Sequence, residues 1–333
     1  MAQSVRSVRP EQTDGMKRAM EAAERLRVAI ASALAGKPEV VERAVITTLS
    51  RGHLLVEDVP GVGKTTLARA IARAIGATFR RVQCTSDLMP SDLVGVSVFN
   101  TLEQRFDFKP GPVFTQVLLA DELNRATPRT QSALLEAMSE RQVSTDGVTR
   151  PLDELFLVIA TQNPDDTAGT YPLPDSQLDR FFMRTSIGYP AADIEKQLLL
   201  SRKEDEAEDV TAALTVDELL AAQREVERVH VEEAALDYVH AIVMATRTHG
   251  EVSVGVSTRG AKAFLRAACA RALVQGRTYV IPDDISDTAV PVLSHRIRLA
   301  SSEGMLGQLQ SSNARLDSER LMRDILHRTD VPL

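Results

Sequence analysis

The sequence predicts an α/β fold with a mostly parallel sheet between two layers of helices, followed by a smaller all-helical domain. Helical patterns or loops separate five short apolar runs, as in a parallel sheet whose strands are joined by crossovers. These runs cover residues 53–56, 79–82, 117–120, 155–160 and 181–187. After about Pro190 the strand pattern stops, and leucine- and alanine-rich helices are predicted at residues 216–223, 234–247, 257–274, 283–293 and 318–327.

The chain divides into four predicted segments. Residues 1–14 form a flexible tail, residues 15–190 the α/β core, residues 191–214 a linker with an acidic run, and residues 215–333 the helical domain. Apolar positions at steps of three and four from Met16 to Leu34 predict the first helix, and a second covers residues 39–50. Residues 98–108 and 142–152 predict two inserted β-hairpins, the second with the turn dipeptide Asp146-Gly147.

Composition narrows the function classes. The 333 residues are 44% hydrophobic and 26% charged, which is ordinary for a soluble globular protein. The formal net charge of −7 argues against nucleic acid as a partner, because non-specific binding depends on neutralising phosphates. No apolar run approaches the ~20 residues that span a bilayer and the N-terminus has no secretory signal, so we expect a cytoplasmic protein without membrane insertion. Cys84 and Cys269 are expected to be buried free thiols.

A glycine-rich turn between the first predicted strand and the next helix matches most of the phosphate-binding P-loop pattern. Glycines permit the positive φ angles that point successive N–H groups at phosphate, the lysine adds positive charge, and the hydroxyl after it binds Mg²⁺. The expected nucleotide contacts are Pro60, Gly61, Val62, Gly63, Lys64, Thr65 and Thr66, with Lys64 also catalytic and Thr65 also a metal ligand. Asp58 stands where the general pattern has its first glycine. We expect phosphate binding to survive, because the inner glycines approach phosphate most closely and Asp tolerates turn conformations.

Two more strand ends carry polar side chains suited to nucleotide hydrolysis. One apolar run ends in Asp121-Glu122, and another is followed by Thr161-Gln162-Asn163-Pro164. Ligands bind at the carboxyl ends of parallel strands. Asp121 is therefore the predicted Mg²⁺ ligand, Glu122 the group that orients the attacking water, and Asn163 a hydrogen-bonding partner of the γ-phosphate or the water. Surface acids and an ordinary loop start are the alternative interpretations of these motifs.

The order of these motifs resembles that of AAA+ ATPases, and several stretches resemble the MoxR family more narrowly. They are residues 55–66, 110–114, 119–138, 160–164, 173–182, 256–265 and 281–285. The resemblance therefore covers nearly the whole chain after about residue 15. It implies a P-loop AAA+ three-layer sandwich with a helical lid, with ATP and Mg²⁺ as cofactors. It also implies that the two inserted hairpins face a pore or a client.

The resemblance implies roles for three further positions. Asn163 would be the sensor-1 residue, and Arg180 the arginine finger that reaches the ATP of a neighbouring subunit. Such an arginine can be worth ~10³–10⁵ in rate. Arg259 would be the sensor-2 arginine, on a helix capped by Ser257 and aimed at the γ-phosphate of its own subunit. A surface salt bridge is the alternative for both arginines, and Arg125 fits a structural ion pair as well as an interface role.

The function implied by the resemblance is a cytoplasmic ATPase that forms a homo-oligomeric ring, expected to be a hexamer, since a finger in trans needs a neighbour. Hydrolysis of ATP would drive chaperone-like remodelling, maturation, or metal or cofactor loading of a client, with partners that carry a von Willebrand factor A domain. A nucleic-acid-dependent AAA+ motor and a nucleotide-gated scaffold with little turnover are the alternatives. DNA-stimulated hydrolysis that falls steeply with salt would favour the motor. The scaffold is disfavoured by the complete set of Lys64, Asp121, Glu122, Asn163 and Arg180.

Overall fold

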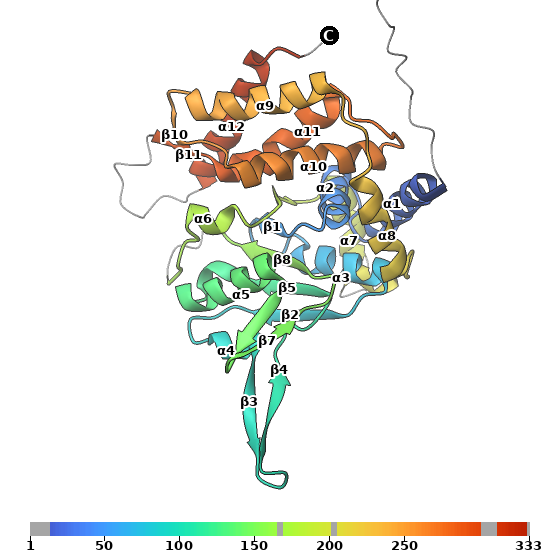
Figure 1. Cartoon of the computed structure of the whole chain (residues 1–333). Coiled ribbons are helices and arrows are strands. Elements are labelled where there is room, and N and C mark those ends of the chain that lie inside the picture. Colours follow the sequence, from blue (N-terminus) through green and yellow to red (C-terminus); the bar gives the residue numbers. More distant parts are fainter. Residues whose placement is uncertain (1–13, 165–168, 201–204, 301–311, 332–333) are drawn as a thin grey trace, which may run out of the picture.

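The computed structural model describes residues 14–164, 169–200, 205–300 and 312–331, and it confirms the predicted parallel sheet. Five parallel strands lie in the order β2-β5-β8-β1-β9 (Figure 1). In chain order they are β1 (Leu54–Glu57), β2 (Phe79–Gln83), β5 (Val117–Asp121), β8 (Leu157–Gln162) and β9 (Met183–Thr185). Each of the five predicted runs contains or overlaps one of these strands. Residues 1–13 of the predicted tail lie outside the described residues.

Side chains along the sheet alternate between two apolar clusters, as expected when both faces are covered. In β1, Leu54 and Val56 belong to one cluster and Leu55 to the other. The first cluster includes side chains of α1 (Asp14–Ala33), α2 (Pro38–Leu49) and α3 (Lys64–Ile75). The second includes side chains of α4 (Pro90–Val94) and α5 (Pro128–Glu140). The sheet is therefore the middle of three layers.

The C-terminal part is helical, as predicted. Its helices are α8 (Val216–Val226), α9 (Glu233–Thr248), α10 (Thr258–Val274), α11 (Pro282–Leu293) and α12 (Ser312–Arg328), with the 3-10 turn η3 (Ser294–Arg296). The first apolar cluster continues into it, because α1 packs against α8 and α2 against α10. The expectation of no strands beyond Pro190 was wrong: β10 (Val252–Val254) and β11 (Arg298–Leu299) pair antiparallel. Strands this short show no periodicity.

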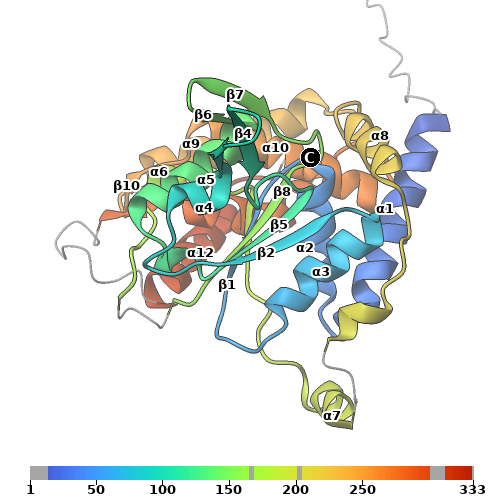
Figure 2. The ribbon, with the colours of Figure 1, turned by 90° about the horizontal axis from the view of Figure 1, so that it is seen from below.

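Shorter elements connect these parts. They are η1 (Leu123–Arg125), α6 (Asp175–Leu178), α7 (Ala192–Leu200) and η2 (Glu206–Asp209). Helix α7 has no buried residue and stands apart from the body in Figure 2. Cys84 and Cys269 are buried free thiols, as expected, and burial raises the pKa of Cys84 to about 12 and of Cys269 to about 11. Among the described helices, none combines the length and the apolar character that a membrane crossing requires.

Both predicted hairpins are present. The first joins β3 (Gly95–Asn100) to β4 (Arg105–Pro110) and projects away from the body (Figure 1). The second joins β6 (Gln142–Thr145) to β7 (Val148–Pro151). Its two turn residues have positive φ angles, 55° at Asp146 and 74° at Gly147, as a two-residue hairpin turn requires.

Candidate nucleotide-binding site

The P-loop lies between the carboxyl end of β1 and the first turn of α3. Gly61 and Gly63 have φ angles of 82° and 99°, and a Cβ atom at either position would meet no heavy atom within 4 Å. The glycines are therefore required by backbone conformation rather than by crowding. Together with the N-terminus of α3, the loop presents backbone N–H groups suited to phosphate.

Asp58 explains how this loop dispenses with the usual first glycine. Its backbone does not have a positive φ, so no glycine is needed there. Its carboxylate accepts hydrogen bonds from the backbone N–H groups of Val59 (2.9 Å), Ile187 (2.6 Å) and Gly188 (2.6 Å), and from the Ser186 hydroxyl (2.9 Å). Burial opposes ionisation, but these bonds prevail and lower the pKa of Asp58. The residue thus joins the P-loop to the segment that follows β9.

Lys64 lies close to the predicted acidic residues. Its Nζ donates to the backbone carbonyl of Asp58 at 2.7 Å. Burial lowers the pKa of Lys64, while the negative charges of Asp121, Asp58 and Glu122 act in the opposite direction. The structure therefore brings the lysine and the two carboxylates at the carboxyl end of β5 to the same edge of the sheet.

Asp121 and Glu122 are both held through Thr161. The Thr161 hydroxyl donates to Asp121 Oδ1 at 2.6 Å and accepts from the backbone N–H of Glu122 at 2.8 Å. Glu122 has a φ angle of 55°, a left-handed conformation that costs energy for a non-glycine residue and that recurs at active sites as well as in turns. Its carboxylate pairs with Arg125 at 3.3 Å, which is the local ion pair that the sequence left open.

The residues at this edge fit a nucleotide with Mg²⁺. The Thr65 hydroxyl and the Asp121 carboxylate are oxygen ligands of the kind that Mg²⁺ prefers. The Gln162 carbonyl accepts from the Asp58 N–H at 3.1 Å, and the Gln162 Nε2 amide is buried without a partner among the described residues. Asn163 follows directly after β8. A donor left unsatisfied beside the P-loop is suited to a ligand with acceptor oxygens.

Two arginines that the sequence analysis did not identify contact residues at the nucleotide-binding edge of the sheet. Arg81 of β2 donates to Asp121 Oδ2 from Nη2 at 2.6 Å and from Nε at 3.1 Å. Arg315 of α12 donates to the Glu57 carbonyl, directly before Asp58, at 2.8 Å. An alternating strand pattern could have placed Arg81 near Asp121, but no local signal identifies Arg315, because its position depends on how α12 packs.

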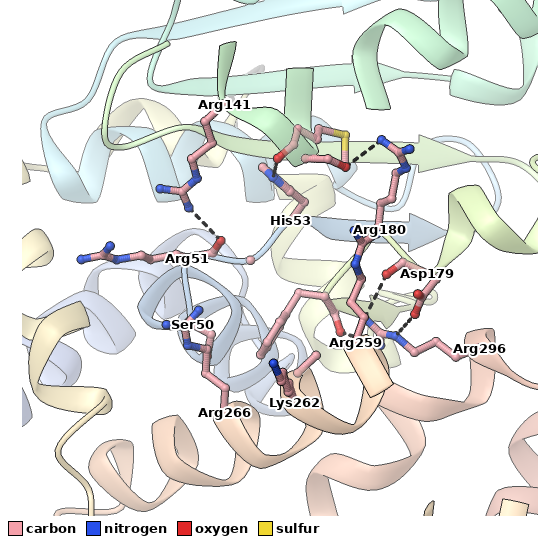
Figure 3. A pocket seen from close by; sticks show the side chains of 15 residues that line it. Ser50, Arg51, His53, Arg141, Asp179, Arg180, Arg259, Lys262, Arg266 and Arg296 are labelled. Atoms are coloured by element: carbon pink, nitrogen blue, oxygen red, sulfur yellow. Dashed lines mark hydrogen bonds and ion pairs between the residues drawn. The ribbon is translucent and has the colours of Figure 1, made fainter. Parts of the chain in front are cut away.

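The remaining predicted residues, Arg180 and Arg259, lie at the opposite edge of the sheet. They line one pocket with Gly52 and His53, which precede β1, and no P-loop residue lines it (Figure 3). The five residue steps from His53 to Asp58 extend over roughly 16 Å of extended chain. The structure thus places Arg259 in a pocket that shares no residue with the P-loop of its own chain.

The position of Arg259 follows from how the first turn of α10 is fixed. Ser257 caps the helix by accepting from the Gly260 N–H at 3.0 Å, and its hydroxyl donates to Asp179 Oδ2 at 3.1 Å. Arg296 pairs with the same carboxylate at 2.8 Å. Asp179 therefore holds the first turn of α10 beside Arg180, whose Nη1 donates to the Leu135 carbonyl at 2.5 Å.

Comparisons with known proteins agree with this architecture. A model of the ATPase family associated with various cellular activities (AAA) matches residues 53–183, and a model of the AAA lid domain matches residues 244–318. YeaC of Bacillus subtilis is 42% identical over 301 residues, covering 90% of this chain and 92% of YeaC. Chaperone MoxR1 of Mycobacterium tuberculosis is 39% identical over 299 residues, covering 87% of this chain and 79% of MoxR1. A crystal structure of a candidate ATPase from Cytophaga hutchinsonii, 33% identical, has a TM-score of 0.83 and covers 96% of this chain and 98% of that one.

Proposed function

Because this chain belongs to the MoxR family of AAA+ ATPases, we propose that it hydrolyses ATP with Mg²⁺ in a ring of identical subunits and uses the cycle to remodel a client protein. The main support for hydrolysis is the grouping of Lys64, Asp121 and Glu122 at the carboxyl ends of β1 and β5. A cation and two carboxylates at a P-loop are the groups that phosphoryl transfer to water needs.

Each residue at this edge has a proposed role. Lys64 exchanges the Asp58 carbonyl for the β- and γ-phosphate oxygens. Glu122 orients the attacking water and accepts its proton, and Asn163 donates to the γ-phosphate. The proposed ligands of Mg²⁺ are Thr65 and Asp121, and the ion neutralises phosphate charge when bound.

The two arginines support a ring. Arg180 and Arg259 lie at the edge of the sheet opposite the P-loop, so both are available to the nucleotide of an adjacent subunit. A head-to-tail contact of this kind repeats around a closed ring, and we propose a hexamer. Positive charge from both arginines would stabilise the charge that develops on the transferred phosphoryl group.

Subunit mixing tests the trans arrangement. Lys64→Ala should abolish nucleotide binding but keep the arginine edge, whereas Arg180→Ala should bind ATP and hydrolyse it at least 10²-fold more slowly. Mixed rings should regain part of the wild-type rate, because Lys64→Ala subunits supply fingers to intact P-loops. Mixtures no faster than the sum of their parts, or an Arg180→Ala variant as fast as wild type, would refute this arrangement.

The hairpin β3–β4 is the proposed client contact. Phe99 and Phe106 stack edge-to-face with their ring centroids 5.2 Å apart, and Leu102 at the tip is 94% exposed. Apolar side chains exposed together on a projecting element mark a site of protein contact. We propose that the client carries a von Willebrand factor A domain and that the protein works in the cytoplasm, where ATP is present.

A trapped complex tests the client role. Glu122→Gln should bind ATP without hydrolysing it and retain a von Willebrand factor A domain protein in a pull-down. Adding Leu102→Ser and Phe106→Ser should release that protein, whereas Leu236→Ser, at an exposed position on α9, should not. Recovery that is independent of the hairpin substitutions would refute the assignment.

A further inference from the structure

The pocket at the arginine edge is strongly cationic. It has a volume of about 540 Å³ and lies between the segment before β1, the end of α5, the segment before β9 and the first turns of α10 (Figure 3). Asp179 is the single carboxylate among its described lining residues. The cationic side chains that line it are Arg51, Arg141, Arg180, Arg259, Lys262, Arg266 and Arg296.

Only part of this positive charge is balanced within the chain. Three of the cations have carboxylate partners: Arg296 with Asp179 at 2.8 Å, Arg266 with Glu227 at 2.5 Å, and Arg51 with Glu154 at 3.9 Å. Within the described residues no carboxylate pairs with the other four, Arg141, Arg180, Arg259 and Lys262.

The proposed arginine-finger and sensor-2 roles account for Arg180 and Arg259 but not for the other two cations, Arg141 and Lys262. Arg141 donates to the backbone carbonyls of Glu154 and Arg51, both at 3.3 Å, and the Glu154 carboxylate attracts it without forming an ion pair. Lys262 lies one turn after Arg259 on α10. Cations near a helix N-terminus oppose the helix dipole, and cations three residues apart repel each other. This arrangement costs stability unless an anion binds there.

Unsatisfied polar atoms provide a second, independent indication. The Ser50 side chain lines the pocket, the residue is 2% exposed, and its Oγ has no hydrogen-bond partner among the described residues. The Nε of Arg51 is likewise buried without a partner. Buried polar atoms are normally paired, so two unpaired donors in residues that line a cationic pocket fit a ligand whose acceptor oxygens reach them after a local side-chain movement.

We propose that this pocket is a polyphosphate-binding site in which Arg141 and Lys262 contact the anion together with Arg180 and Arg259. A triphosphate carries about four negative charges, which matches the four unbalanced cations. Two sources share this chemistry. One is the ATP held by the adjacent subunit, which rests on the function proposed above, and the other is a free polyphosphate or nucleotide.

The test for a free anion does not depend on ATP hydrolysis. Inorganic tripolyphosphate is titrated by calorimetry into full-length Lys64→Ala protein, whose own P-loop is disabled. Adding Arg141→Gln and Lys262→Gln should weaken binding at least tenfold, because each removes a charge-assisted hydrogen bond. The matched control, Arg80→Gln with Lys17→Gln, removes one exposed arginine and one exposed lysine and should leave binding within about twofold.

Subunit mixing tests the other source. Lys64→Ala subunits that also carry Arg141→Gln and Lys262→Gln should rescue Arg180→Ala subunits at least tenfold less than Lys64→Ala subunits do. Weakened tripolyphosphate binding identifies a free anion, and weakened rescue alone identifies the neighbour's ATP. If neither tripolyphosphate binding nor rescue changes although Lys64→Ala subunits rescue normally, the proposed site is refuted. If no mixture of subunits is active, the proposed ring is refuted, and the calorimetry still shows whether the pocket binds a free polyphosphate. If Arg141→Gln impairs folding, Lys262→Gln is tested alone, and it should weaken tripolyphosphate binding or rescue by at least about threefold.

Discussion

Asp58 offers the sharpest test of how the P-loop is held. Asp58→Ala removes the acceptor of four hydrogen bonds and leaves the N–H groups of Ile187 and Gly188 without their partner. Ile187 is 5% exposed, so its N–H cannot turn to bulk water without local opening. An unsatisfied buried donor costs about 1–3 kcal/mol, and Gly188 is only half-buried, so the expected loss of unfolding free energy is about 3 kcal/mol.

Urea unfolding at pH 7 measures this loss, with Ser186→Ala as the matched control. That control removes one donor and leaves the carboxylate bound by the three backbone N–H groups, so it should cost about 1 kcal/mol. The pKa of Asp58 is lowered in the folded state, hence its contribution is complete above the unfolded value of about 4 and is lost as pH falls through the lower folded value. An Asp58→Ala loss below about 1 kcal/mol, or one equal to that of Ser186→Ala, would refute the reasoning.

Three further predictions follow from single contacts. Arg81→Gln removes the cation that competes with Mg²⁺ for its predicted carboxylate ligand, so half-maximal Mg²⁺ for tight nucleotide binding should fall about fivefold by fluorescence titration, with Arg80→Gln unchanged. Gly52→Ala places a Cβ 2.3 Å from a phenylalanine side chain and should cost about 3 kcal/mol in urea unfolding, whereas Gly250→Ala, in open space, should be near neutral; equal effects contradict the crowding argument. Burial lowers the pKa of His53 from 6.5 to about 4, so the unfolded state gains the proton first and the unfolding free energy should drop by at least about 3 kcal/mol between pH 6.5 and 4, because burial also lowers the pKa of His295; a flat profile would contradict this.

The sequence could place the candidate nucleotide-binding residues on one edge of the sheet because its signals are local. Lys64 and Asn163 come after apolar strands and Asp121 ends one, and parallel strands place their carboxyl ends on one edge. Knowing that three runs are parallel strands is enough to bring these residues together. The hairpin turn at Asp146 was predictable for a similar reason, since Asp-Gly favours the positive φ angles that the turn adopts.

The arginine edge could not be placed in the same way. The edge that Arg259 faces depends on where α10 packs, and this is decided by Ser257 and Arg296 meeting Asp179 from 78 and 117 residues away in sequence. Each partner of that contact is an ordinary polar residue in its own segment. Arg315 is a similar case, because its bond to the base of the P-loop depends on the packing of α12 rather than on neighbouring residues.

Two aspartates connect the two edges of the sheet to the segments that follow the core. Asp58 holds residues 186–188, which lead out of β9 toward α7, and its own carbonyl holds Lys64. Asp179 holds the first turn of α10 next to Arg180. In the proposed function Lys64 leaves the backbone carbonyl of Asp58 when it binds a phosphate, and Asp58 is also the residue that holds the segment after β9. When Arg180 moves toward a neighbour, it moves beside the residue that fixes the helical part. In the proposed cycle, a change at either edge would therefore act on how the helical part is attached, which is the coupling that nucleotide-driven remodelling requires.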